Sequence, residues 1–158
     1  MVLRNQVEWA LHCCAILSGV AEGEYITTKD LAEFHGVPKE YLSKALQALA
    51  RAKLVETTLG PAGGYRLNRH PKDISFLDIV EAVEGKTSTF HCSEIRQNNP
   101  CATTKSKGVC DVAKVMYQAD EAWREVLRNM NLEMLGKQLE QKLPQSLQDK
   151  TKNWFAGR

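Results

Sequence analysis

Apolar side chains in the first fifty residues recur at three- and four-residue steps, which is the period of amphipathic helices. One such stretch covers residues 5–18, and Gly19 suits its C-terminal end. A second covers residues 38–50, with leucines along one side. Between them we expect a short helix over residues 29–34, because one of two threonines can cap its start and Gly36 follows its end. Helix, glycine-containing turn and helix is the order of a helix-turn-helix.

The period changes after residue 50. Two short runs of β-type residues, 54–58 and 64–67, flank a turn rich in glycine and proline. A further amphipathic helix begins at the predicted N-cap Ser75. A helix followed directly by a two-stranded ribbon is how a winged helix presents one helix and one hairpin to DNA. The pattern therefore predicts a mainly α fold, in which residues 1–85 form a winged helix-turn-helix domain that binds double-stranded DNA. A small helical domain that merely packs a hairpin is the alternative.

A longer apolar stripe begins at Asp111, the predicted N-cap of a long helix, and continues to Met130. It spans about five helical turns, which is more than one small domain can cover. We therefore predict that residues 111–142 form a dimerisation region, in which Asn131 caps a shorter second helix, and that the protein is a homodimer. Packing of the stripe onto the winged domain is the alternative. Residues 143–158 show no period and are predicted to be a flexible tail.

The composition is that of an ordinary globular protein, with 158 residues, 43% apolar and 25% charged. No run approaches about 18 consecutive apolar residues, so we expect no membrane span. The N-terminus lacks the pattern of a signal peptide. These features favour a cytoplasmic protein whose thiols stay reduced, so its five cysteines indicate metal or redox chemistry rather than structural disulfides. The sequence has no phosphate-binding loop or nucleophile motif, which argues against an enzyme.

Basic residues are concentrated where DNA would lie. The net charge is only +2, but the stretch from His35 to Lys72 holds seven lysines and arginines against two glutamates. The leucines of residues 38–50 face inward, so the polar side of this helix is predicted to read bases together with the wing. The predicted DNA-binding residues are Lys39, Glu40, Tyr41, Ser43, Lys44 and Gln47 on the helix and Gly63, Gly64, Tyr65 and Arg66 on the wing. An ordinary solvated basic face is the alternative.

Residues 86–110 separate the winged domain from the long helix. They are polar and have no sustained period, which predicts a loop. A loop of about 25 residues in a compact protein is usually functional or disordered. This loop holds Cys92, Cys101 and Cys110, with eight residues in each gap. Thiolates on such a loop are candidate ligands for a metal centre.

Glu8 and His12 are spaced i, i+4 in the first helix, so their side chains project from one face about one turn apart. An exposed carboxylate–imidazole pair is the ordinary interpretation, because such pairs are common in helices. The same spacing also lets two donors share one metal ion. Cys13 and Cys14, which follow in the same helix, are expected to pack as small apolar residues.

Two motifs, LVETTLGPAGGYRL and DISFLDIVEAVEG, resemble the Rrf2 family of bacterial winged-helix regulators, and the similarity runs from Val7 to about Cys110. The resemblance implies a homodimeric transcription factor, here a repressor, that binds a palindromic operator. It also implies that activity is often set by an iron–sulfur cluster. Many members carry a basic residue just before the first wing glycine, able to reach into the minor groove. This sequence has Leu59 there, so that contact is not expected.

Cluster-binding members of the family resemble this chain in carrying three cysteines before the dimerisation helix. A non-cysteine ligand completes their coordination, and in some it comes from the first helix of the partner subunit. Glu8 and His12 match that position, and with both available two thiolates would complete the four positions of a [2Fe–2S] cluster at the dimer interface. We therefore expect the ligands to be Glu8 and His12 of one subunit and Cys101 and Cys110 of the other, because Cys110 adjoins the long helix. Cys92 is then the spare thiol, or a ligand if three cysteines bind. A cluster-free regulator controlled by a thiol switch or a protein partner is the alternative function.

Overall fold

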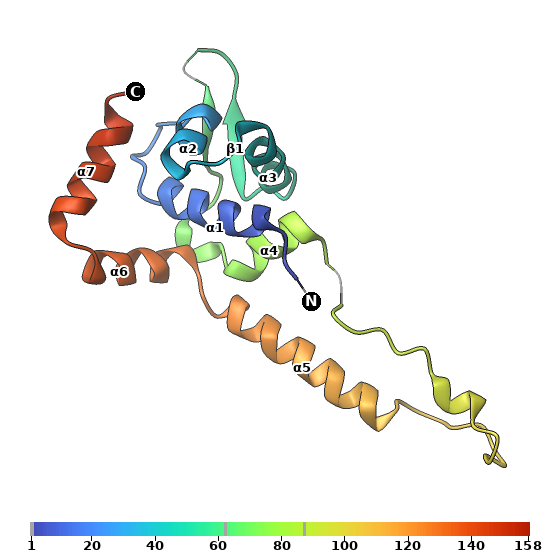
Figure 1. Ribbon diagram of the computed structural model, residues 1–158. Helices are drawn as coiled ribbons and strands as arrows, with labels where there is room; N and C mark the ends of the chain where they lie inside the picture. The colour runs from blue at the N-terminus through green and yellow to red at the C-terminus, as the bar shows by residue number, and fades with distance from the viewer. Residues whose placement is uncertain (1, 62, 87) are drawn as a thin grey trace.

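The computed structural model describes residues 2–61, 63–86 and 88–158. Over these residues the chain is mainly helical, with one two-stranded antiparallel sheet (Figure 1). In chain order the elements are α1 (Asn5–Leu17), α2 (Thr28–His35), α3 (Lys39–Arg51), β1 (Val55–Thr58), β2 (Gly64–Leu67), η1 (Pro71–Asp73), α4 (Phe76–Glu84), η2 (Ile95–Asn98), α5 (Asp111–Arg128), α6 (Leu132–Lys142) and α7 (Gln145–Ala156). The predicted winged helix-turn-helix is confirmed in the order and type of its elements.

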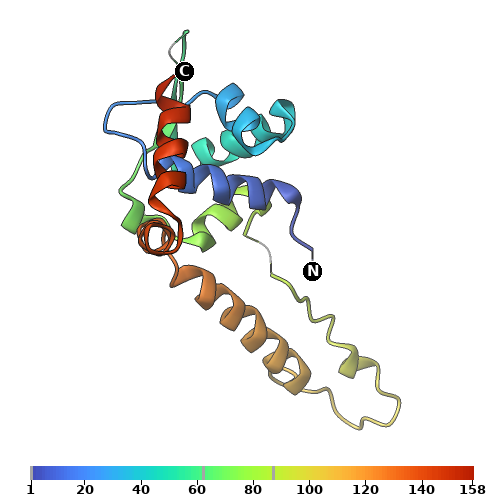
Figure 2. The same cartoon turned by 60° about the vertical axis from the view of Figure 1, so that its left-hand side comes forward.

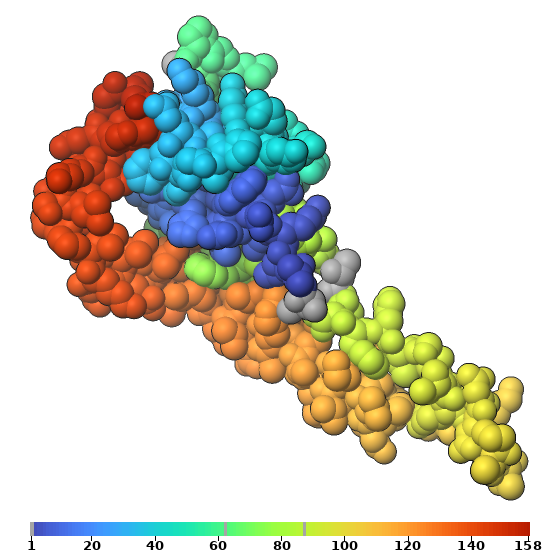
Figure 3. Space-filling model, viewed as in Figure 1, coloured from blue at the N-terminus to red at the C-terminus, as the bar shows by residue number. Residues whose placement is uncertain are grey.

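Helices α1–α4 and the sheet form a reading head, residues 5–84, from which α5 projects to one side (Figures 1 and 2). The described part of the cysteine loop, residues 88–110, runs outward beside α5, and α5 then returns to the head. We call α5 and the cysteine loop together the stalk. The space-filling view shows the stalk leaving the head as a narrow extension, while α6 and α7 follow the opposite side of the head (Figure 3).

The core of the reading head is built from one side of each helix. Leu42, Leu46 and Leu49 of α3 are fully buried, as their spacing in the sequence predicts. They pack in one cluster with buried residues of α1, α2 and α4. Burying a leucine side chain contributes about 1.5–3 kcal/mol. This packing therefore fixes which side of α3 faces solvent.

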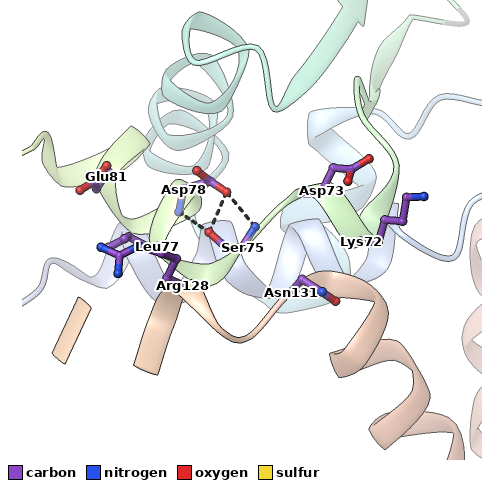
Figure 4. A pocket seen from close by; sticks show the side chains of 8 residues that line it. All are labelled: Lys72, Asp73, Ser75, Leu77, Asp78, Glu81, Arg128 and Asn131. Atoms are coloured by element: carbon purple, nitrogen blue, oxygen red, sulfur yellow. Dashed lines mark hydrogen bonds between the residues drawn. The ribbon is translucent and has the colours of Figure 1, made fainter. Parts of the chain in front are cut away.

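Side-chain caps define where the helices of the head begin. Thr27 accepts a backbone N–H at the start of α2, and Gly36 ends that helix with a φ of 62°. Ser75 and Asp78 form a reciprocal capping box at the start of α4, in which each side chain accepts the other's backbone N–H (Figure 4). The predictions of Ser75 and of Asn131, at the start of α6, as N-caps are confirmed.

The wing is joined to the head by a backbone bridge. The Ile26 N–H donates to the Tyr65 carbonyl at 3.0 Å, and the Tyr65 N–H donates to the Ile26 carbonyl at 2.8 Å. Gly64 lies so close to this bridge that a Cβ atom there would overlap the Ile26 carbonyl. Glycine at position 64 thus allows the wing to approach the segment before α2.

Helix α5 leaves most of its apolar stripe in solvent. It begins at Asp111, with Cys110 in the N-cap position that the sequence assigned to Asp111. Val115 is 62% exposed and Val126 is 71% exposed. Within α5, all of which is described, only Ala113 is fully buried. Packing onto the reading head therefore does not account for the stripe.

Residues 145–156 form helix α7, although the sequence shows no period there, and the flexibility of the tail stays a prediction. The rings of Trp154 and Phe155 pack against Phe34 of α2, with centroids 5.2 and 4.8 Å apart. Arg158 stacks on Trp154 at 3.8 Å and also forms an ion pair with α2 at 2.7 Å. The two aromatic residues are adjacent in sequence rather than one turn apart. They therefore give no helical period, and the contact with α2 stabilises a helix that the sequence pattern does not indicate.

Gly64→Ala is expected to lower the free energy of unfolding by about 1–3 kcal/mol, because the added methyl group must push the wing away from Ile26. Gly136→Ala is the matched control. Nothing lies within 4 Å of its Cβ position in α6, and alanine favours a helix over glycine by about 1 kcal/mol. Its stability should therefore stay level or rise. Urea denaturation followed by circular dichroism measures both variants, and wild-type stability in Gly64→Ala would contradict the close approach.

Candidate functional site

The outer side of α3 presents polar and aromatic side chains to solvent. Tyr41 is 55% exposed, and the Lys44 ammonium lies 5.6 Å from the centre of its ring. The Gln47 amide donates to the Ser43 hydroxyl at 3.3 Å. An aromatic ring beside a cation on this helix suits contact with base edges and phosphates. The structure places all the predicted helix residues on this accessible side, exposed or, for Ser43, half-buried: Lys39, Glu40, Tyr41, Ser43, Lys44 and Gln47.

The predicted wing residues fall into two groups. Gly64 and Tyr65 are buried at the base of the wing beside Ile26, where they hold the wing on the head. Gly63 is half-buried near the tip, and Leu59 at the tip is 94% exposed. A direct contact of Gly64 or Tyr65 with DNA stays a prediction.

Arg66 lies on β2, where it pairs with Glu56 directly across the ladder. Its guanidinium also lies 4.7 Å from the centre of the Tyr25 ring. The hydrogen bond to Glu56 raises the pKa of Arg66 above its ordinary value. Because Glu56 offsets its charge, Arg66 is a weaker candidate for phosphate binding than the exposed Lys44.

Glu8 and His12 are both exposed on α1. The His12 ring lies 5.8 Å from the ring of His35, at the end of α2. Burial lowers the pKa of His35, and the neighbouring His12 lowers it further. Over the described residues, the Nε2 atom of His35 is buried and makes no hydrogen bond. The sequence pattern assigns His35 only to a turn, because a contact between two helices leaves no local period.

Arg96 joins the two sides of the cysteine loop. Its guanidinium pairs with Glu94 at 2.5 and 2.8 Å and donates to the Gly108 carbonyl at 2.7 Å. The pKa of Arg96 is raised, first by the hydrogen bond to Glu94 and further by the charges of Cys110 and Cys92. Both thiols therefore lie within electrostatic range of one cation. Sequence reasoning missed Arg96, because nothing in its spacing relates it to the cysteines.

The five cysteines occupy two kinds of environment. Cys92 and Cys101 are exposed on the loop, and Cys110 is half-buried at the N-cap of α5. Cys13 and Cys14 are buried in α1, and burial raises the pKa of the Cys13 thiol to about 12. The prediction that Cys13 and Cys14 pack as core residues is confirmed.

One chain does not bring the predicted ligands together. Over the described residues, no three side chains of His, Cys, Asp or Glu are placed to hold a metal ion. Glu8 and His12 belong to α1, in the reading head, whereas the three cysteines belong to the cysteine loop. Figures 1 and 2 show this loop extending away from the head. Carboxylate, imidazole and thiolate donors suit an iron–sulfur cluster chemically. These donors can bind one cluster here only if the cysteine loop of one subunit lies against α1 of another subunit.

A hollow of about 480 Å³ lies between η1, α4 and the start of α6, and Figure 4 shows the side chains around it. Its lining residues are Lys72, Asp73, Ser75, Leu77, Asp78, Glu81, Arg128 and Asn131. Ser75 and Asp78 are already engaged in capping α4. Charges of both signs surround the hollow, so it has no evident preference for an anion or a cation.

The sequence matches the Rrf2 family, described as an iron-dependent transcriptional regulator, over residues 3–138. The chain belongs to the Rrf2 family. Helix α7 lies beyond the matched residues. Among the described residues, no helix has both the length and the apolar character needed to cross a membrane.

Relatives and solved structures support this assignment. NsrR of Geobacillus kaustophilus, an HTH-type transcriptional regulator, is 31% identical over 127 residues, which are 80% of this chain and 84% of that protein. NsrR of Bacillus subtilis is 29% identical over 140 residues, 89% and 93% of the two proteins. CymR, the global cysteine regulator of B. subtilis, has a similar fold, with a TM-score of 0.70 at 22% identity over 87% of this chain and 97% of that one. IscR of T. potens has a TM-score of 0.69 at 22% identity, over 92% and 93%. This Rrf2-family protein is thus a transcriptional regulator and not an enzyme.

Proposed function

We propose that this protein represses transcription as a homodimer, in which α3 and the wing of each reading head contact one half of a palindromic operator. The exposed polar side of α3, within the basic stretch 35–72, carries the proposal. Lys39 and Lys44 supply positive charge near the N-terminal half of α3, which enters the major groove in this class of protein. Glu40 repels phosphate but accepts a hydrogen bond from a cytosine amine, so it favours particular bases.

Lys44→Ala is expected to weaken operator binding and to reduce the slope of log affinity against log salt concentration by about one unit, because one phosphate contact is lost. Lys137→Ala is the control, since Lys137 lies on α6 and pairs with Glu133 at 3.0 Å. Arg66→Ala should have a smaller effect than Lys44→Ala, because Glu56 already offsets the charge of Arg66. Fluorescence anisotropy with an operator selected from random duplexes measures all three. An unchanged affinity and slope in Lys44→Ala would place the DNA surface elsewhere.

We infer that α5 supplies the dimer interface. Its exposed stripe includes Val112, Val115, Met116 and Val126, and the reading head of the same chain does not cover it. An exposed apolar stripe that runs over several helical turns is typical of an interaction site, because water is released when the stripe is covered. A second copy of α5 offers the matching surface, since a two-fold axis places the same stripe on both sides.

Val115→Asp and Met116→Asp are each expected to weaken dimerisation by about 2–5 kcal/mol, because each buries an unpaired carboxylate in the interface. Gln118→Asp introduces the same charge into α5 at an exposed position outside the stripe, and should leave the dimer intact. Sedimentation equilibrium at low micromolar concentration separates monomer from dimer. Intact dimers in both stripe variants would rule out this surface.

We further propose that a [2Fe–2S] cluster is held at the dimer interface by Glu8 and His12 of one subunit and Cys101 and Cys110 of the other. All four residues are at least partly accessible, and they come from two regions that are separate within one chain. Such a cluster, when bound, supplies a reversible one-electron centre. Glu8 and His12 project from one face of α1 and so fix the spacing of two ligands. The thiols are supplied by the cysteine loop of the stalk, whose two sides Arg96 joins by hydrogen bonds to Glu94 and Gly108.

A three-cysteine site is the competing ligand set. The charges of both Cys92 and Cys110 act on Arg96, so Cys92 and Cys110 share one cationic neighbour. A cluster-free thiol switch at the loop cysteines is the second candidate function. It is motivated by the exposed thiols and by the fold of CymR from Staphylococcus aureus, whose oxidised form has a TM-score of 0.65 at 24% identity.

Protein purified without oxygen is expected to be coloured, and Cys101→Ala and Cys110→Ala are expected to lose the visible absorbance. Glu8→Ala and His12→Ala should lose or shift it, whereas the control Cys92→Ala should keep it. Iron and sulfide analysis of the same samples measures occupancy. Colour lost in Cys92→Ala but kept in Glu8→Ala and His12→Ala would favour three cysteines. Wild-type protein made with ample iron but containing neither iron nor sulfide would leave the thiol switch as the function.

A further inference from the structure

A continuous chain of hydrogen bonds joins the cysteine loop to the reading head through α5. The Thr89 N–H donates to Asp120 Oδ1 at 3.2 Å. Asp120 Oδ2 accepts from Arg124 Nε at 3.2 Å, one turn further along α5. Arg124 Nη1 then donates to Glu81 Oε1 in the last turn of α4 at 2.5 Å. Three parts of the molecule that are distant in sequence are therefore linked by four residues.

The three charged side chains that form these hydrogen bonds are largely shielded from water. Those of Asp120, Arg124 and Glu81 are 12%, 15% and 19% exposed. Arg128 and Glu121 form an ion pair on the same helix in which the two side chains are 50% and 61% exposed. Shielded charges interact more strongly and tolerate the loss of a partner less well than exposed ones. The pKa of Asp120 is lowered, chiefly by the hydrogen bond from Thr89, with Arg124 adding to it against the effect of burial.

The hydrogen-bond chain ends in the reading head at Glu81, on a helix that contacts several others. Helix α4 packs against α1 and α3 as well as α5. In the same last turn of α4, Glu84 accepts from Arg4 Nε at 3.0 Å and from the Arg4 backbone N–H at 2.8 Å, which ties the start of α1 to α4. A displacement of this turn therefore reaches both the helix that carries Glu8 and His12 and the helix that carries the reading surface.

We propose that Asp120 and Arg124 are positioning residues that transmit a rearrangement of the cysteine loop to Glu81, and so set the placement of α4 and of α3 packed on it. The inference rests on the proposed function in one respect, namely that the loop is where the signal is received. If the loop moves, Asp120 loses the Thr89 N–H and draws more strongly on Arg124, which changes how Arg124 is shared between Asp120 and Glu81. A second arrangement, in which Asp120 no longer accepts from Thr89, would give this hydrogen-bonded relay the two states that a switch requires.

Iron-free protein provides the first test. Asp120→Ala cuts the loop end of the chain and leaves the Arg124–Glu81 pair in place. We expect it to raise amide hydrogen exchange in the last turn of α4 by about threefold or more. Arg128→Gln, which removes the exposed ion pair on the same helix, is the matched control and should leave that exchange unchanged. Unchanged exchange in α4 of Asp120→Ala would overturn the relay. If Asp120→Ala does not fold, Asp120→Asn replaces it, since it removes the charge that faces Arg124 and so weakens the middle of the relay; it should raise the same exchange, and unchanged exchange would overturn the relay.

Operator affinity provides the second test, with the ratio of dissociation constants between iron-reconstituted and iron-free protein as the readout. We expect a ratio of about fivefold or more in wild type and in Arg128→Gln. In Asp120→Ala and Glu81→Gln the ratio should fall to within about twofold of unity, with affinity in one state preserved. A wild-type ratio retained in both variants would contradict the relay. A ratio of one in wild type would contradict sensing by the loop, while the exchange measurement still decides the relay.

Discussion

The reading head depends on the burial of one side of α3. Its leucines are covered by α1, α2 and α4, and any rotation of α3 about its axis would expose them to water. The polar side is therefore presented outward without any ligand to hold it there. The same requirement places α4 beneath α3, because α4 supplies part of the apolar surface that covers it. The orientation of the proposed DNA-contacting surface is thus a consequence of core packing.

Helix α4 has a second role that follows from its position. Its first turn is fixed by the capping box of Ser75 and Asp78, and its last turn carries the two glutamates that bind Arg4 and Arg124. The apolar middle serves stability, whereas the charged end connects the head to the rest of the chain. Interactions of these two kinds respond differently to change. Packed leucines resist small displacements, but an ion pair can be exchanged for another.

The fold could be predicted largely from the sequence, because its signals are local. The spacing of Leu42, Leu46 and Leu49, the cap at Ser75 and the glycine-rich turn each act within a few residues. Contacts between distant segments could not be predicted in this way. The docking of Trp154 on Phe34, the approach of His12 to His35 and the pairing of Arg124 with Glu81 depend on how helices meet.

The candidate site shows the same difference between local signals and contacts of distant segments. The polar side of α3 follows directly from the leucine spacing, so its residues were accessible to prediction and are found in solvent. Gly64 and Tyr65 were predicted to contact DNA because they belong to the wing. Their burial depends on a backbone bridge between Tyr65 and Ile26, which lies about forty residues earlier in the sequence. In the cysteine loop, thiolate ligands could be predicted only from the presence of three cysteines, and not from their arrangement in space. Arg96, whose pKa responds to the charges of Cys110 and Cys92, is placed by a hydrogen bond to the opposite side of the loop.

The projection of α5 from the head gives the molecule a lever arm. Eighteen residues of helix are about 27 Å long at 1.5 Å per residue. A tilt of about 10° where α5 meets α4 would therefore move its far end by about 5 Å, close to the pitch of one helical turn. Half-sites on one face of DNA are separated by about 34 Å, so the proposed dimer, joined by two such arms, would be sensitive to small angles at the base of each arm. Geometry alone can thus convert a tilt of a few degrees near the Arg124–Glu81 pair into a mismatch with the spacing of the DNA grooves.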